Sequence, residues 1–101
     1  MKLLEEIKIG SLKSRNRIIM SPMAMYSAKN GLANDFHFVQ YGSRAIGGAG
    51  IIVVEATAVE KIGRITPGDL GIYNERQAKR LSKIANFIEK YGAIPGIQLA
   101  H

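Results

Sequence analysis

The apolar residues of the chain gather in four short runs of the kind that forms buried strands. The second run is β-branched as well as apolar, which suits a strand covered on both faces. The first run is centred on Gly10 and predicts a small N-terminal hairpin, with a loose arm as the alternative. The four runs are Ile7 to Leu12, Arg17 to Met20, Ile51 to Glu55 and Ile94 to Leu99.

Helical spacing marks the segment from Asp35 to Gly47. Asn34 is a candidate N-cap, and a cluster of glycines ends the segment. Residues recur at three- and four-residue spacings, which predicts that one face of this helix packs inward. The residues of this expected face are Phe36, Val39, Ser43 and Ile46.

A second helical segment runs from Glu75 to Tyr91. Asn74 is the expected N-cap, Gln77 takes the third helical position as in a capping box, and Gly92 stops the helix. The apolar stripe consists of Ala78, Leu81, Ile84, Ala85 and Ile88.

The order strand, helix, strand, helix, strand predicts an α/β fold. Two right-handed crossover units require parallel strands with helices packed outside them. Three such strands are equally compatible with a doubly wound open sheet and with a (β/α)8 barrel. In a barrel, function lies at the carboxyl ends of the strands, which are here Ser21 to Tyr26, Ala56 to Ala58 and Gln98 to His101.

Composition limits the classes of function. The chain is 47% hydrophobic and 22% charged, as in ordinary globular proteins. It has no cysteine, which excludes disulfide scaffolds and thiol catalysis. No apolar run approaches the roughly 18 residues of a membrane span and no signal peptide is seen, so we expect a cytoplasmic protein without a membrane partner.

The net charge of +6 raises the question of nucleic acid. The basic residues fall on the expected solvent side of the second helix, and no aromatic residues alternate with them to stack bases. We therefore expect no nucleic-acid partner. These residues are Lys79, Arg80, Lys83 and Lys90.

Gly47, Gly48 and Gly50 superficially resemble a phosphate-binding loop. A dinucleotide-binding loop must follow a strand and open a helix, whereas these glycines close a helix and precede a strand. They predict a tight turn between helix and strand.

Five segments resemble, in chain order, the old yellow enzyme family of flavin-dependent ene-reductases, in the subgroup of bacterial and thermophilic xenobiotic reductases. The junction from Arg15 to Tyr26, where a strand stops at Pro22, resembles the N-terminal part of sequences in this family. Any one match is weak, but together they cover the whole chain. The segments are Leu12 to Arg17, Ser43 to Ala45, Gly50 to Ala56, Gly63 to Ile65 and Gly96 to His101.

This resemblance implies the N-terminal portion of a (β/α)8 TIM barrel, preceded by the small hairpin. It implies an enzyme that binds FMN, takes hydride from NADH or NADPH, and reduces the C=C bond of an α,β-unsaturated carbonyl compound. The family's pattern continues for more than twice this length. We therefore expect residues 1–101 to be a single partial domain that is inert alone.

The resemblance also implies a flavin-binding loop. Ser21, Pro22, Met23 and Ala24 match residues that line FMN in the family. At Ala24 the subgroup usually has a cysteine, and other members a threonine, either of which can adjust the flavin potential. Alanine cannot, so we expect binding there without redox tuning. Tyr26 matches an active-site tyrosine and is the expected substrate contact, although a lone tyrosine more often packs.

Gln98 is a neutral amide near the end of an apolar strand. An unsatisfied polar group buried there costs about 1–3 kcal/mol, so it should have a partner. The residue by itself leaves a flavin contact and a hydrogen bond to barrel backbone equally open. The resemblance implies that Gln98 binds the pyrimidine side of the flavin and that Ala56 approaches the same polar edge.

No metal site is expected. His37 lies in the first helix without a partner at ligand spacing, so a surface or packing role is expected, and His101 is expected to be structural. In the family, the carbonyl-binding and phosphate-binding residues come from later strands.

Two alternatives stay open. In the first alternative, the chain is a non-catalytic remnant or an assembly subunit. Its partner would be a complementary barrel fragment or a second copy in a homo-oligomer. A flavin barrel of the dihydroorotate dehydrogenase type is less favoured, because its motifs differ from Ser21, Pro22 and Met23.

Overall fold

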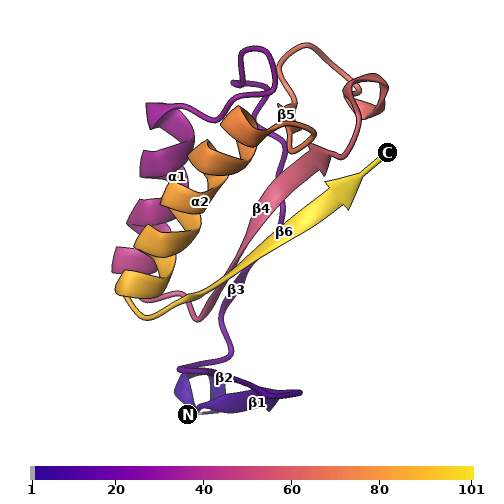
Figure 1. Ribbon diagram of the computed structural model, residues 1–101. Helices are drawn as coiled ribbons and strands as arrows, with labels where there is room; N and C mark the ends of the chain where they lie inside the picture. Colours follow the sequence, from indigo (N-terminus) through magenta and orange to yellow (C-terminus); the bar gives the residue numbers. More distant parts are fainter. Residues whose placement is uncertain (1) are drawn as a thin grey trace.

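The computed structural model describes residues 2–101 as one parallel sheet with two helices on one of its faces (Figure 1). The helices lie side by side and contact each other and the sheet. This arrangement confirms the predicted α/β fold. In chain order the elements are η1 (Lys2–Leu4), β1 (Ile7–Ile9), β2 (Leu12–Ser14), β3 (Ile19–Met20), α1 (Asp35–Ile46), β4 (Ile51–Ala58), η2 (Lys61–Gly63), β5 (Leu70–Gly71), α2 (Glu75–Lys90) and β6 (Ile94–Ala100).

Strand β4 is the centre of the sheet. Strand β6 pairs along one of its edges, and β3 and β5 pair with the other edge, near its beginning and its end. The register places Ile19, Ile51 and Ile94 in one row across the sheet. Strand β4 extends past the predicted end at Glu55, and β5 was not predicted, because two residues are too short to leave a pattern.

The N-terminal segment forms the predicted hairpin rather than a loose arm. Strands β1 and β2 pair in antiparallel register around Gly10, whose φ of 60° favours glycine. The hairpin lies beyond the amino-terminal end of β3, far from the carboxyl ends of the parallel strands (Figure 1). The backbone N–H of Arg17 donates to the carbonyl oxygen of Leu3 at 2.9 Å, which ties the hairpin to the chain entering β3.

Helix α1 begins at the predicted cap, since the Asn34 side chain accepts a hydrogen bond from the Phe36 N–H. The predicted packing face was wrong. Phe36, Val39 and Ile46 are exposed, and Ser43 with them. The buried residues are His37, Tyr41, Gly42 and Ala45. Tyr41 hydrogen-bonds Glu55 of β4, while the buried His37 bonds its own N-cap, Asn34. A search for apolar spacing does not detect polar residues that face inward.

Helix α2 packs with its predicted stripe, of which Leu81, Ile84 and Ile88 are buried. The Asn74 side chain accepts from the Gln77 N–H at 2.9 Å and caps the helix as expected. The Gln77 side chain instead accepts from the backbone N–H of Tyr73, so the reciprocal half of a capping box is replaced by a bond outside the helix. The buried stripe joins Ile52, Val54 and Leu70 in one core.

The predicted basic face of α2 lies in solvent, since Lys79, Arg80, Lys83 and Lys90 are all exposed. Arg80 also donates to the carbonyl oxygen of Ala33 at 2.8 Å. Within residues 2–101, no helix is both long enough and apolar enough to cross a membrane.

The guanidinium of Arg15 joins the carboxyl-terminal ends of both helices. It donates to the carbonyl oxygens of Ala45 at 2.8 Å, Ala49 at 2.9 Å and Tyr91 at 2.7 Å. These carbonyls lie in or just beyond the last turns of α1 and α2, where the helix dipoles favour a positive charge. A side chain at Gly92 would meet the same guanidinium, because an added Cβ would lie 2.7 Å from Arg15 Nη1.

Replacement of Arg15 by methionine is expected to lower the free energy of unfolding by about 2–3 kcal/mol, because three carbonyl groups lose a charged donor at the helix ends. Urea denaturation followed by circular dichroism measures this loss. Arg17→Met is the matched control, since Arg17 is exposed, and it should change stability by less than about 0.5 kcal/mol. Equal losses in the two variants would contradict the role given to Arg15.

Candidate functional site

The three strand ends predicted to carry function lie at one edge of the sheet. Strands β3, β4 and β6 are parallel, so their carboxyl ends point the same way, toward the top of Figure 1. The loop 21–26 follows β3, while Ala56 and Gln98 lie near the ends of β4 and β6. The structure therefore brings the predicted site residues to the same edge of the fold.

The loop 21–26 presents side chains rather than burying them. Met23 and Tyr26 are 49% and 65% exposed, Ser21 and Ala24 are also exposed, and Pro22 is half-buried. Pairing stops at β3, just before the proline, as predicted from its missing N–H. The loop thus offers a surface of small, soft and aromatic groups at the strand ends.

A β-bulge places Ala56 opposite Gln98. Val54 pairs with Ile97 and Thr57 with Leu99, so two residues of β4, Glu55 and Ala56, together oppose Gln98 of β6. Bulges bend a strand and redirect side chains, and they are common beside active sites.

Gln98 is exposed, which differs from the buried position expected from its apolar strand. Strand β6 has one paired edge in residues 2–101, and the sheet face opposite the helices is uncovered there. The expected cost of an unpaired buried amide therefore does not arise within this part of the chain. Its carboxamide is open to a ligand at the strand edge.

Tyr26 has a left-handed backbone with φ of 55°, a conformation that is strained for a bulky residue. Gly68 lies against it, because a Cβ added at Gly68 would lie 2.5 Å from the Tyr26 carbonyl oxygen. The Ala28 N–H donates to the Gly68 carbonyl oxygen at 2.9 Å. The connection between β4 and α2 thus supports the loop after β3 at the predicted substrate contact.

A buried network that the sequence analysis missed lies under this loop. The Tyr41 hydroxyl donates to Glu55 Oε1 at 2.6 Å, and the backbone N–H of Met25 donates to Glu55 Oε2 at 3.2 Å. His37 Nε2 lies 3.9 Å from Glu55 Oε1, and the His37, Tyr41 and Glu55 side chains are at most 1% exposed. The sequence did contain one indication of this network, since Glu55 directly follows the apolar run 51–54. A buried charge needs partners, so its position predicts hydrogen-bond donors nearby.

Burial sets the protonation of this network. Desolvation lowers the pKa of His37, against the opposing attraction of the Glu55 carboxylate. Desolvation raises the pKa of Tyr41, and its hydrogen bond to Glu55 raises it further. At neutral pH the imidazole is therefore uncharged, and the phenol keeps the proton that it donates.

Neither histidine belongs to a cluster of potential metal ligands in the described part of the chain. Residues 2–101 contain no group of three or more metal-ligating side chains of the His, Cys, Asp and Glu types. His37 is a packing residue, one of the two roles expected for it. His101 is exposed, with its Nε2 atom 3.4 Å from Glu60 Oε2.

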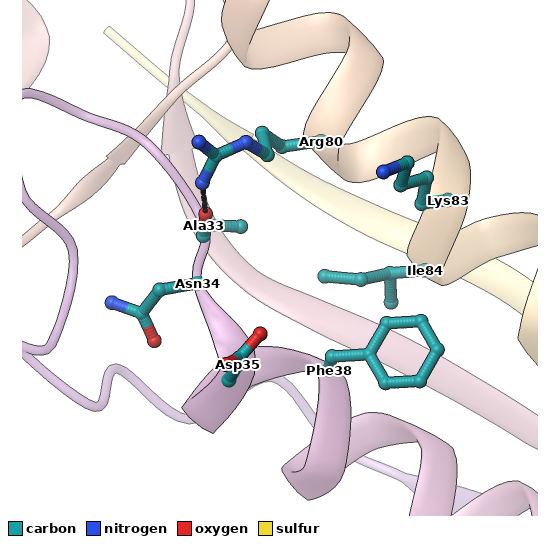
Figure 2. A pocket seen from close by; sticks show the side chains of 7 residues that line it. All are labelled: Ala33, Asn34, Asp35, Phe38, Arg80, Lys83 and Ile84. Carbon is teal, nitrogen blue, oxygen red and sulfur yellow. Dashed lines mark hydrogen bonds between the residues drawn. The ribbon is translucent and has the colours of Figure 1, made fainter.

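A pocket of about 310 Å³ lies between the start of α1 and the middle of α2 (Figure 2). Its lining includes no predicted site residue. The bond from Arg80 to the Ala33 carbonyl closes one side of it. The lining residues are Ala33, Asn34, Asp35, Phe38, Arg80, Lys83 and Ile84.

Comparison with known proteins identifies the family. The model of the NADH:flavin oxidoreductase / NADH oxidase family matches residues 2–101. The chain belongs to this family. An NADPH dehydrogenase of Listeria monocytogenes serotype 4b is 50% identical over 102 residues, which cover 99% of this chain and 30% of the relative. An NADPH dehydrogenase of Clostridium acetobutylicum is 48% identical, covering 100% of this chain and 30% of the relative. The chain thus spans 30% of the length of these relatives.

Solved structures decide between the two α/β architectures. Morphinone reductase matches with a TM-score of 0.90 at 27% identity, over 98% of this chain and 26% of that one. Old yellow enzyme from Pichia sp. AKU4542 matches with a TM-score of 0.93 at 26% identity, over 99% and 26%. In this flavin oxidoreductase family the sheet is part of a TIM barrel, and a doubly wound sheet is excluded.

His37 should make stability fall as the pH is lowered below about 6.5, the ordinary histidine value. Its pKa is lower in the folded state, so the unfolded chain binds more protons in the window beneath 6.5, and protonation favours unfolding there. Urea denaturation at about pH 7.5 and pH 5.5 measures the difference. His37→Gln should flatten it, whereas the exposed control His101→Gln should keep it. The same pH dependence in both variants would disprove the assignment.

Proposed function

We propose that this chain is the N-terminal segment of an FMN-dependent enzyme that reduces the C=C bond of α,β-unsaturated carbonyl compounds with NADH or NADPH. The observation that carries the proposal is the shared strand edge, where loop 21–26, Ala56 and Gln98 come together. Family membership and the names of the relatives, NADPH dehydrogenase and old yellow enzyme, support it.

The chemistry of this edge suits a flavin ring. The exposed Gln98 carboxamide offers donors and an acceptor, which match the alternating groups of a flavin pyrimidine. Ala56, opposite it, is small enough for a planar ring to approach. FMN supplies hydride transfer when bound. The residues proposed to hold it are Ser21, Pro22, Met23, Ala24, Ala56 and Gln98.

Tyr26 is the proposed substrate contact. Its side chain is 65% exposed and extends from the same loop as the proposed flavin contacts. A phenol on an exposed loop can donate a hydrogen bond to a carbonyl oxygen. The strained backbone of Tyr26 fits this role, because strained conformations cluster at sites where a side chain is held in a fixed orientation toward a ligand.

A second reading is an assembly subunit, or a non-catalytic remnant, that requires a complementary fragment. The exposure of an apolar residue favours it, because a complementary fragment would cover that residue. Ile19 is 55% exposed at one end of the row that it forms with Ile51 and Ile94. This row lies on the face opposite the helices, which is the interior face of a barrel. The proposed occupant is the remainder of a barrel, and a homo-oligomer is the alternative.

The 101-residue chain is expected to show no turnover alone, whereas one polypeptide joining it to the C-terminal segment of the Listeria monocytogenes NADPH dehydrogenase is expected to be active. This chimera is called the assembled enzyme below. NADPH oxidation with cyclohexenone and added FMN measures activity. Turnover by the chain alone would contradict the need for a complement. An assembled enzyme that is folded and loaded with FMN but leaves cyclohexenone unreduced would contradict the proposed function.

Gln98→Leu in the assembled enzyme should weaken FMN binding by about ten- to a hundredfold, or about 1–3 kcal/mol, because the polar edge of the ring loses a paired amide. Fluorescence titration of the apoprotein with FMN gives the dissociation constant. Gln40→Leu on α1, away from the strand ends, is the control and should bind FMN as the parent does. An unchanged constant for Gln98→Leu would remove Gln98 from the flavin site.

A further inference from the structure

Glu55 is a carboxylate in a place where strands rarely hold charge. Its side chain is 1% exposed, beside the buried Val54 and Thr57. A buried carboxylate is tolerated only when donors surround it. The donors here come from two separate parts of the chain, namely the Tyr41 hydroxyl of α1 and the Met25 N–H of loop 21–26.

The Tyr41 hydroxyl is fully committed to Glu55. It donates to Oε1 and also accepts a hydrogen bond from the backbone N–H of Glu55 at 3.0 Å. Helix α1 therefore holds both the carboxylate and the backbone of the bulge. This leaves Oε2 as the acceptor for Met25.

His37 adds a second polar group beside the same carboxylate. Its Nδ1 accepts from the Asn34 N–H at 3.1 Å and also lies 3.2 Å from Asn34 Oδ1. The first contact assigns the proton of the neutral ring to Nε2. That N–H lies 3.9 Å from Glu55 Oε1 and has no hydrogen-bond partner in the described part of the chain. This distance is too long for a hydrogen bond, so His37 does not draw the carboxylate away from Met25.

The carboxylate connects two parts of the proposed flavin site. Through its backbone, Glu55 belongs to the bulge that sets Ala56 opposite Gln98. Through its side chain, it holds the N–H of Met25, which directly precedes the strained Tyr26. We propose that Glu55 is a positioning residue that fixes loop 21–26, and with it Tyr26, relative to Ala56 and Gln98. This inference rests on the proposed function and deepens it.

The role requires a carboxylate rather than an amide. Glu55 receives donors on both oxygens, whereas a glutamine has one oxygen and one NH2 group. The Tyr41 hydroxyl, already accepting from the Glu55 N–H, must donate to the remaining oxygen. Glu55→Gln therefore turns an NH2 group toward the Met25 N–H, and the loop loses its attachment.

The test compares Glu55→Gln with Glu89→Gln in the FMN-loaded assembled enzyme. Glu89 is exposed on α2, so the control makes the same change of charge away from the loop. Hydrogen exchange at the Met25 amide reports on the loop without relying on activity. We expect roughly tenfold faster exchange and a roughly tenfold higher KM for cyclohexenone in Glu55→Gln, with a smaller change in kcat, and parental values in the control.

Parental exchange and parental KM in folded Glu55→Gln would overturn the inference. If exchange is faster in Glu55→Gln but the parent enzyme does not reduce cyclohexenone, the positioning of the loop is supported and the proposed function is overturned. If Glu55→Gln does not fold, Glu55→Asp keeps the charge but shortens its reach, and the same measurements apply.

Tyr41→Phe separates positioning from general stability. It removes one donor from the network and leaves the Met25 bond in place. We expect it to lower the unfolding temperature while the Met25 amide stays protected and KM stays near the parental value. Equal KM changes in Tyr41→Phe and Glu55→Gln, at equal losses of stability, would assign Glu55 a purely structural role.

Discussion

The parallel pairing of β4 with strands on both of its edges is the constraint from which the rest of the structure follows. A parallel neighbour cannot be reached by a tight turn, so α1 carries the chain from β3 to β4 and α2 carries it on to β6. Their packing on one face leaves the other face as the barrel interior. The same pairing brings the ends of β3, β4 and β6 to one edge, and the bulge in β4 then sets which side chains meet there.

The opposite end of the fold is held by Arg15. Its guanidinium donates to carbonyls in or just beyond the last turns of both helices, so a residue before β3 fixes the carboxyl ends of α1 and α2. Glu55 has the corresponding position at the site end, where it joins α1, β4 and the loop after β3. Two different charged groups, Arg15 and Glu55, thus join separate elements at opposite ends of the same sheet.

Much of the fold could be predicted from the sequence because helices and buried strands leave regular patterns. Helix α2 was predicted nearly to the residue, with its cap at Asn74 and its stop at Gly92. The position of helix α1 was predicted correctly but its inward face was not, because the residues that face inward include the polar Tyr41, bonded to Glu55, and His37. The site residues came from a family resemblance. The bond between Met25 and Glu55 could not be predicted, since it joins residues thirty positions apart.

The contact between Gly68 and Tyr26 couples the conformations of two successive loops, the loop after β3 and the loop after β4. Tyrosine rarely adopts a left-handed backbone, and here the absence of a side chain at Gly68 leaves room for it. A loop transplanted from a relative to alter substrate preference would therefore carry its geometry only if the partner glycine came with it. A bulkier residue at position 68 would collide with the backbone of Tyr26, so a change in either loop constrains what the other can accept.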